Sequence, residues 1–158
     1  MQKIVPNLWF DTEAEEAAEF YVSLFDDSKL LGVVPYGEAG PGEPGTVMVV
    51  NFQLLGQEYV AINGGPQFPF TEAVSFEVRC QDQEEVDRLW DALTADGGQE
   101  VQCGWLKDKY GLSWQIVPER WVELAAAPDK AKVDAAMKAM LGMTKLDIAE
   151  LERAYAEG

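Results

Sequence analysis

The fold of this chain is decided by two heptapeptides that correspond to each other: Glu15-Glu16-Ala17-Ala18-Glu19-Phe20-Tyr21 and Glu84-Glu85-Val86-Asp87-Arg88-Leu89-Trp90. In each, acidic residues come first and apolar or aromatic residues follow at helical spacing, which predicts an amphipathic helix. Each heptapeptide also follows a strand-like stretch, residues 4–10 and 73–80, by a similar distance. The chain therefore contains one structural unit twice.

Strands and turns follow each of the two predicted helices. In the first copy, residues 37–45 hold four glycines and two prolines and predict a loop, and in the second copy residues 108–111 predict a turn. We interpret each copy as a βαβββ module. The predicted strands are residues 4–10, 30–36, 46–54 and 58–62 in the first copy, and 73–80, 100–106 and 112–117 in the second.

Polar residues mark where the helices of the two modules begin. Thr12-Glu13-Ala14-Glu15 has the pattern of a capping box, in which side chains satisfy the free backbone N–H groups of a helix start. Asp82, with Glu85 three residues later, has the same pattern in the second module. We therefore expect Thr12 and Asp82 to cap the two helices.

The C-terminal part of the chain has a different, helical character. Residues 129–141 and 144–156 predict two helices, and Thr144-Lys145-Leu146-Asp147 predicts a capping box at the start of the second. The predicted fold class is α+β, with duplicated βαβββ modules that form a curved mixed sheet. The expected organisation is a single domain over residues 1–158, with modules at 1–66 and 70–119 and a helical tail at 128–158.

Composition and charge exclude several classes of function. The chain has 158 residues, 12 of them Lys or Arg and 28 Asp or Glu, so its formal net charge is -16. Nucleic acids and anionic membranes repel such a chain, because binding to them depends on cationic side chains. The chain has no histidine, which excludes Ser–His–Asp and Cys–His catalysis and every histidine-containing metal site.

Cysteine use and targeting signals favour a cytoplasmic protein. The two cysteines, Cys80 and Cys103, form no CxxC unit and make no disulfide scaffold, so we expect both to be reduced. The N-terminus runs directly into strand-like sequence without the apolar segment of a signal peptide. No apolar run approaches the ~20 residues that a membrane-spanning helix needs.

Four segments of the chain resemble a known family. They are residues 4–10, 15–21, 82–87 and, most specifically, 103–118, which read Ile-Val-Pro-Asn-Leu-Trp-Phe, Glu-Glu-Ala-Ala-Glu-Phe-Tyr, Asp-Gln-Glu-Glu-Val-Asp and Cys-Gly-Trp-Leu-Lys-Asp-Lys-Tyr-Gly-Leu-Ser-Trp-Gln-Ile-Val-Pro. They resemble the PhnB-like branch, often labelled demethylubiquinone methyltransferase-like, of the vicinal oxygen chelate superfamily. That superfamily includes glyoxalase I and the bleomycin-binding proteins. The resemblance implies a mostly bacterial origin and a homodimer.

The resemblance also implies where a metal would bind. Metal enzymes of the superfamily place one ligand on the first and last strand of each module, and those positions fall near Val5, Val60, Ala73 and Gln115. Three of the four side chains are apolar and cannot coordinate a cation. Gln115 alone keeps a ligating oxygen. We therefore expect no metal and no cofactor.

The methyltransferase label of the branch has no support in the residues. Methyltransferases of the doubly wound class hold S-adenosylmethionine against a glycine-rich turn after the first strand. Here Phe10 is followed by Asp11-Thr12-Glu13, and no GxGxxG-like run occurs. We do not expect methyl transfer from these residues.

Polar and aromatic side chains on the concave face of the predicted sheet form the candidate ligand site. By strand alternation Asn7 and Trp9 share one face of the first strand, and Ser75 and Glu77 share one face of the fifth. Glu77 is the candidate catalytic residue, because a carboxylate inside an aromatic cavity can act as a general base. The candidate ligand-binding residues are Asn7, Trp9, Asn63, Ser75, Cys103, Trp105 and Gln115.

Each candidate also has a structural alternative. Glu77 can form an ion pair with Arg79, Cys103 can be a half-buried structural thiol, and the tryptophans can fill the core or a dimer interface. The leading hypothesis is a metal-independent homodimer that binds a small organic molecule. The alternatives are an enzyme with Glu77 as acid or base and a metal-dependent lyase or dioxygenase.

Overall fold

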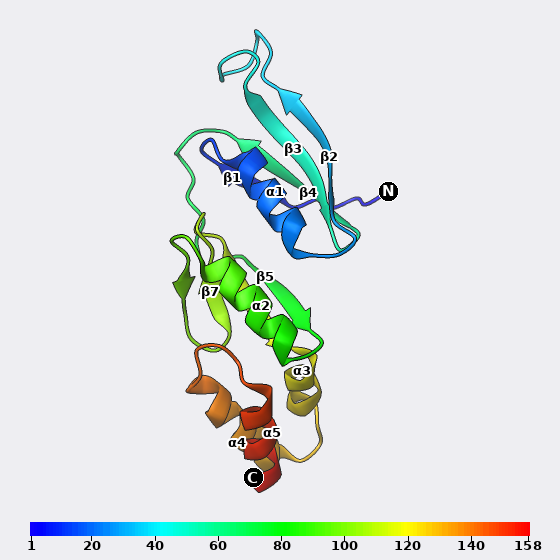
Figure 1. Cartoon of the computed structure of the whole chain (residues 1–158), viewed down its shortest axis with the longest axis vertical. Coiled ribbons are helices and arrows are strands. Elements are labelled where there is room, and N and C mark those ends of the chain that lie inside the picture. The colour runs from blue at the N-terminus through cyan, green and yellow to red at the C-terminus, as the bar shows by residue number, and fades with distance from the viewer. The chain divides into compact units, whose positions relative to one another are not determined.

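The computed structural model describes all 158 residues, which form two compact units, Met1–Pro69 and Phe70–Gly158 (Figure 1). Each unit contains one four-stranded mixed sheet, and each sheet has one parallel strand pair and two antiparallel pairs. The two sheets have the same strand order, β1-β4-β3-β2 in the first and β5-β8-β7-β6 in the second, so the first strand of each unit pairs with its last. The α+β class and the duplicated βαβββ module are confirmed.

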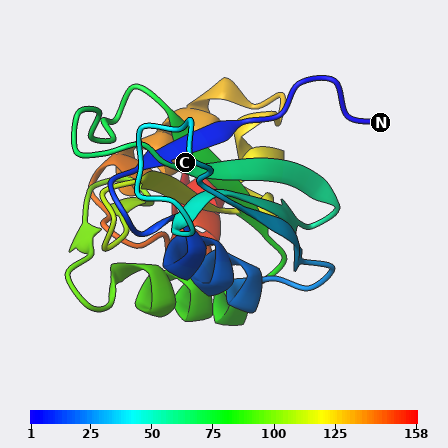
Figure 2. The same ribbon diagram turned by 90° about the horizontal axis from the view of Figure 1, so that it is seen from above.

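The first unit packs one helix on one face of its sheet (Figure 2). Ala17 and Tyr21 of that helix and Val50 and Phe52 of the sheet are fully buried, so the helix and the sheet share an apolar core. Its elements are β1 (Asn7–Phe10), α1 (Ala14–Leu24), β2 (Lys29–Pro35), β3 (Val47–Leu54) and β4 (Gln57–Asn63).

The second unit repeats this arrangement and adds three helices after its last strand. Leu89 and Leu93 of α2 and Leu106 and Ile116 of the sheet are fully buried. Its elements are β5 (Ser75–Cys80), α2 (Gln83–Thr94), β6 (Gln99–Glu100), β7 (Trp105–Lys107), β8 (Ser113–Pro118), α3 (Glu119–Ala125), α4 (Lys130–Leu141) and α5 (Ile148–Glu157).

The starts of α1 and α2 are capped in different ways. Asp82 caps α2 as predicted, because its Oδ1 accepts a hydrogen bond from the Glu85 N–H at 2.9 Å. The prediction for Thr12 was wrong. The Ala14 N–H instead donates to Oδ1 of Asn63, at the end of β4, at 2.8 Å. A residue 49 positions away along the chain thus replaces the local capping box.

The predicted strand at residues 100–106 is interrupted. Cys103 and Gly104 have φ angles of 61° and 83°, in the left-handed region, so the backbone turns between β6 and β7. The N–H groups of Cys103 and Gly104 donate to the carbonyls of Met143 and Thr144, each at 2.8 Å. These two hydrogen bonds attach the turn to the C-terminal segment.

The C-terminal helices differ from the prediction at two places. Helix α3 begins directly after Pro118, where no helix was predicted. Helix α5 begins at Ile148 rather than at Thr144, and Asp147 is its capping residue. Thr144 lies in a bend before the helix, where its carbonyl accepts from the Gly104 N–H at 2.8 Å.

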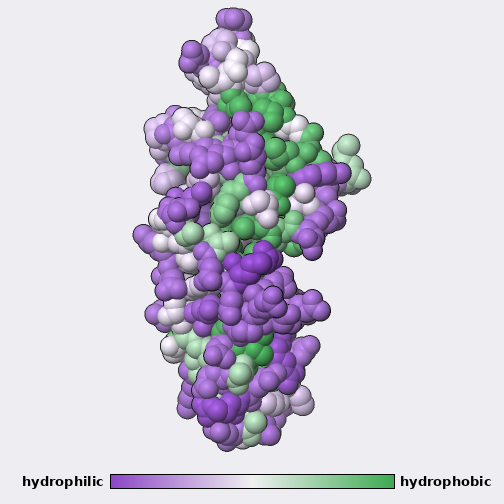
Figure 3. Space-filling model, viewed as in Figure 1, coloured by the Kyte–Doolittle hydropathy of each residue, from purple (hydrophilic) through white to green (hydrophobic).

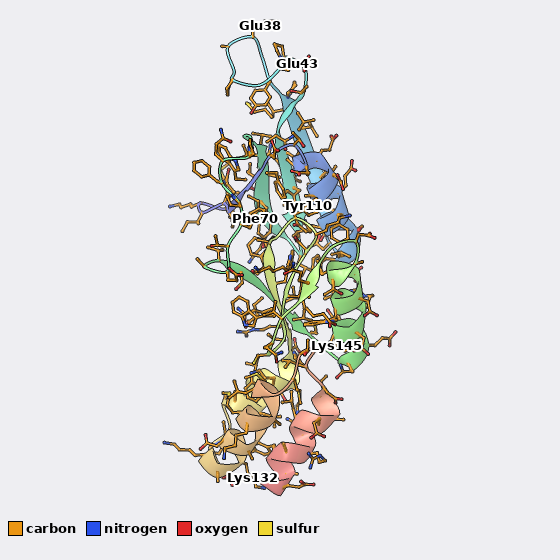
Figure 4. The ribbon with its side chains drawn as sticks, turned by 90° about the vertical axis from the view of Figure 1, so that its left-hand side faces the viewer. Glu38, Glu43, Phe70, Tyr110, Lys132 and Lys145 are labelled. Atoms are coloured by element: carbon orange, nitrogen blue, oxygen red, sulfur yellow. The ribbon has the colours of Figure 1, made fainter.

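The three C-terminal helices share a small apolar core and are attached to α2. Gln83 of α2 donates to the Leu146 carbonyl at 3.0 Å and accepts from the Ile148 N–H at 2.8 Å. Lys145, labelled in Figure 4, pairs with Asp87 at 2.8 Å and holds the pKa of that carboxyl below its usual value. The helical core consists of Leu124, Leu146 and Leu151, with Trp121, Met140, Met143 and Tyr155 packed against it.

Candidate functional site

The second unit contains a cavity of about 410 Å³, which we call the β8 cavity because Gln115 and Val117 of β8 line it. The sheet supplies one wall and the C-terminal helices supply the other. Four residues predicted from the sequence, Glu77, Cys103, Trp105 and Gln115, meet in its lining. The remaining lining residues are Val117, Trp121, Val122, Ala125, Ala126, Met140 and Leu146.

Three of the lining side chains form a row across three strands. Gln115 of β8 is the direct neighbour of Glu77 on the parallel strand β5 and of Trp105 on the antiparallel strand β7. Directly paired residues of neighbouring strands present their side chains on the same face of a sheet. The sheet register therefore places a carboxylate, an amide and an indole side by side.

The amide of Gln115 is oriented by the neighbouring strand. Its Nε2 donates to the hydroxyl of Ser75 at 2.9 Å, so the predicted ligand-binding residue Ser75 acts on the cavity through Gln115. Ser75 is absent from the cavity lining. The Oε1 of Gln115 makes no hydrogen bond within the protein and is available as an acceptor.

Glu77 lines the cavity but is engaged in an ion pair. Its Oε2 accepts a hydrogen bond from Nε of Arg79 at 3.0 Å, and the two side chains are 39% and 60% exposed. The ion pair named as an alternative in the sequence is therefore observed. An exposed pair of this kind contributes little to stability, about 0–1 kcal/mol.

The two cysteines have different surroundings, and both are free. Cys103 is half-buried at the cavity, and its Sγ lies 3.8 Å from the Leu141 carbonyl. Cys80 is buried outside the cavity, and burial, reinforced by the charge of Glu85, raises the pKa of its thiol to about 12. Cys80 therefore stays protonated at neutral pH, and only Cys103 has access to a ligand.

The other three predicted site residues belong to the first unit, where each has a structural role. Asn7 is exposed, and its Nδ2 donates to the Val5 carbonyl at 2.9 Å. The indole N–H of Trp9 donates to the Gly65 carbonyl at 2.9 Å. Asn63 caps α1, as described above. None of the three residues lines the β8 cavity, and Asn63 lines a separate hollow in the first unit.

A second, larger hollow of about 790 Å³ lies in the first unit beside the glycine-rich loop. Figure 4 labels Glu38 and Glu43 on this loop. The lining includes the carboxylates of Asp11, Glu15, Glu16 and Glu43. Carboxylates at this density repel phosphate, so the glycines serve the loop conformation and not an anion site.

The lining from α3 and α4 was missed by sequence reasoning. Trp121, Val122 and Ala125 do recur at helical spacing, but the segment after Pro118 was not recognised as a helix. In the complete chain, no group of three or more Cys, Asp and Glu side chains gathers to hold a metal ion. The structure also contains no helix with the length and apolar character required to cross a membrane.

Comparison with known proteins agrees with the duplicated fold. A PhnB protein structure from Bacillus cereus, described as a 3-demethylubiquinone-9 3-methyltransferase, is 40% identical, covers 74% of this chain and 99% of that chain, and has a TM-score of 0.68. A Pseudomonas aeruginosa protein is 21% identical, covers 75% of this chain and 98% of its own, and has a TM-score of 0.60. No curated protein matches.

The family model also shows which part of the site is shared. The model described as 3-demethylubiquinone-9 3-methyltransferase matches residues 2–117, which include both βαβββ modules and end one residue before the end of β8. Helices α3, α4 and α5 lie beyond the matched residues, so the sheet wall of the β8 cavity belongs to the matched part and the helical wall does not. As the sequence predicted, the chain belongs to this PhnB-like 3-demethylubiquinone-9 3-methyltransferase family.

Proposed function

We propose that this chain binds a small organic molecule in the β8 cavity without a metal ion. The observation that carries the proposal is the convergence of Glu77, Cys103, Trp105 and Gln115, each selected from the sequence as a site residue, on one cavity. A volume of about 410 Å³ lies within the range of ligand pockets. Apolar walls with a few polar groups are typical of such pockets.

Binding is favoured over catalysis by the state of Glu77. A general base must present its carboxylate to the substrate, and here Arg79 holds one oxygen at 3.0 Å. Catalysis by Glu77 as acid or base is the second candidate, because Glu77 does line the cavity next to Gln115. We propose no methyl transfer: the family name describes that reaction, but β1 leads into α1 through Asp11-Thr12-Glu13 and not through a glycine-rich turn.

The cavity can be tested by filling it. Ala125 is an exposed residue of α3 that lines the cavity, so Ala125→Trp obstructs the cavity without disturbing the core. We expect the unmodified protein to bind 2-phenylethanol with a Kd of roughly 1 mM, as ligand-observed NMR would measure, since small ligands gain at most a few tenths to 1.5 kcal/mol per atom. Ala125→Trp should weaken this binding at least about tenfold.

The matched control for this test is Ala156→Trp. Ala156 is an exposed alanine of α5 outside the cavity lining, so its replacement adds the same side chain elsewhere. The control should bind the alcohol as the unmodified protein does. The proposal would be contradicted if Ala125→Trp and Ala156→Trp bound the alcohol equally. It would also be contradicted if the unmodified protein showed no binding at alcohol concentrations up to 20 times the expected Kd, roughly 20 mM.

We also propose a homodimer that associates through the free edge of the first sheet, which we call the β2 edge. Leu30, Leu31, Val33 and Val34 of this edge strand are 36–44% exposed, and Figure 3 shows apolar side chains gathered over this part of the first unit. Edge strands that stay single are usually protected by charges. The stretch from Leu30 to Val34 has none, whereas the rest of a chain of charge -16 repels a second copy.

Sedimentation equilibrium tests the dimer. We expect twice the chain mass of 17.5 kDa for the unmodified protein and the monomer mass for Val33→Lys, because a lysine at the β2 edge introduces an unpaired charge. Val74→Lys is the control, since Val74 is 64% exposed in the second unit. A monomeric unmodified protein, or a dimeric Val33→Lys, would refute this interface.

A cytoplasmic location is part of the proposal and is supported by the two free cysteines.

A further inference from the structure

The lining of the β8 cavity contains one charged side chain, and that side chain is acidic. Glu77 is the single charged residue in its lining, and no lysine or arginine lines it. The partner of Glu77, Arg79, is 60% exposed and is not part of the lining, although Val117, its direct neighbour on β8, is. In a chain of net charge -16, the field of the distant charges has the same sign. A ligand that takes the place of Arg79 at Glu77 therefore meets a carboxylate, which disfavours carboxylate, phosphate and sulfate ligands.

Two indole rings stand in the cavity lining without an aromatic or cationic partner. Trp105 comes from β7 and Trp121 from α3, so one ring belongs to the sheet wall and the other to the helical wall. The ring contacts of the second unit involve other residues, such as Phe76 with Trp114 and Lys132 with Tyr155. The face of an indole attracts a cation more strongly than any other aromatic side chain does.

Two hydrogen-bond acceptors lie next to each other on the sheet wall. Glu77 and Gln115 are directly paired on β5 and β8, and the Ser75 contact leaves Oε1 of Gln115 available. A carboxylate beside a free amide oxygen suits a ligand that donates hydrogen bonds from a charged nitrogen. Arg79 already makes such a contact to Glu77, with its guanidinium at 3.0 Å.

We propose that the β8 cavity selects organic cations, namely ammonium or amidinium groups attached to a flat or aliphatic body. This inference rests on the proposed ligand-binding function and names its ligand class. The ligand's charged nitrogen donates to the carboxylate of Glu77 and to Oε1 of Gln115. Its apolar body packs between Trp105 and Trp121. Arg79 competes with the ligand for Glu77, so binding exchanges an internal cation for an external one.

Three probes of nearly equal size separate charge from shape: 2-phenylethylammonium, 2-phenylethanol and 3-phenylpropionate. Ligand-observed NMR at low ionic strength should give the cation a Kd roughly three- to tenfold lower than that of the alcohol, because a half-exposed ion pair and a cation–π contact each contribute modestly. The carboxylate should bind most weakly. Added salt should reduce the advantage of the cation.

Two substitutions should change the selectivity in opposite directions. Glu77→Gln removes the acceptor charge and should reduce the ratio of cation to alcohol affinity to about one. Arg79→Gln removes the internal competitor and should raise that ratio at least about twofold. Glu123→Gln is the control, because Glu123 is an exposed α3 carboxylate outside the cavity lining and its loss changes the net charge equally. It should leave the ratio unchanged.

The outcomes distinguish this inference from the proposal on which it rests. If the alcohol and the cation bind equally and Ala125→Trp weakens both, the cavity binds ligands but the cation inference is overturned. If Glu77→Gln and Arg79→Gln shift the ratio in the same direction, the inference is also overturned. If no probe binds, or Ala125→Trp affects none of them, the proposed function itself fails.

Discussion

Replacement of Asp108 by alanine is expected to cost the second unit about 3 kcal/mol of stability. Asp108 is a buried carboxylate, 2% exposed, in the turn between β7 and β8. Its Oδ1 accepts from the N–H groups of Tyr110 and Leu112 at 2.9 and 3.1 Å, and its Oδ2 accepts from the indole N–H of Trp114 at 2.9 Å. Alanine leaves these donors without an acceptor in a region that water does not reach.

Urea unfolding followed by tryptophan fluorescence would measure this loss. Four of the five tryptophans, at positions 90, 105, 114 and 121, lie in the second unit, so the signal reports mainly on that unit. The urea concentration at the midpoint of unfolding should fall, while the slope of the unfolding free energy with urea concentration stays the same. A loss below about 0.5 kcal/mol would show that the turn does not depend on the carboxylate.

Asparagine at position 108 separates the two kinds of contact. Its carbonyl oxygen can still accept from the backbone of the turn, but its amide group then meets the indole N–H of Trp114, and two donors face each other. We expect Asp108→Asn to cost about 2 kcal/mol, and less when Trp114→Phe has already removed the indole donor. Equal costs in both backgrounds would contradict the role of the Asp108–Trp114 contact.

The sequence predicted the parts of the fold that local periodicity determines. Helices α1 and α2 follow from acidic starts and apolar stripes, and the duplication follows from the match between their sequences. The break at Cys103 and Gly104 could not be predicted, because it depends on carbonyls of Met143 and Thr144 about 40 residues later. The cap of α1 by Asn63 was missed for the same reason.

The candidate site was also predicted only where local strand patterns determine it. Strand alternation was sufficient to place Glu77 and Gln115 on the ligand side, whereas Trp105 was selected only as an aromatic residue of the second module. The pairing of β5, β7 and β8 then aligns the three side chains on one face. The helical wall with Trp121 and Ala125 was missed, because alternation within a sheet carries no information about which helix covers it. Sequence reasoning therefore found one wall of the β8 cavity and not its lining as a whole.

Gly104 is the residue that joins these two walls. Its N–H donates to the Thr144 carbonyl, and its carbonyl accepts from the Ile116 N–H, both at 2.8 Å, so it connects β8 with the segment before α5. Its φ of 83° favours glycine. A Cβ at this position would lie 3.1 Å from the Ile116 carbonyl oxygen and 3.0 Å from Cγ of the buried Leu146. Neither neighbour can move without disturbing the core.

Gly104→Ala is expected to lower the stability of the second unit by about 3 kcal/mol and to weaken binding of the phenylethyl probes, because its neighbours Cys103 and Trp105 line the cavity. Gly111→Ala is the matched control: its φ is 88°, and a Cβ there meets no atom within 4 Å. The control carries only the backbone strain, about 1–2 kcal/mol. Unfolding and probe binding measured on both variants therefore isolate the contact between the walls. If the two variants lose equal stability and bind the probes equally, the close approach of Gly104 to Leu146 has no role in forming the cavity.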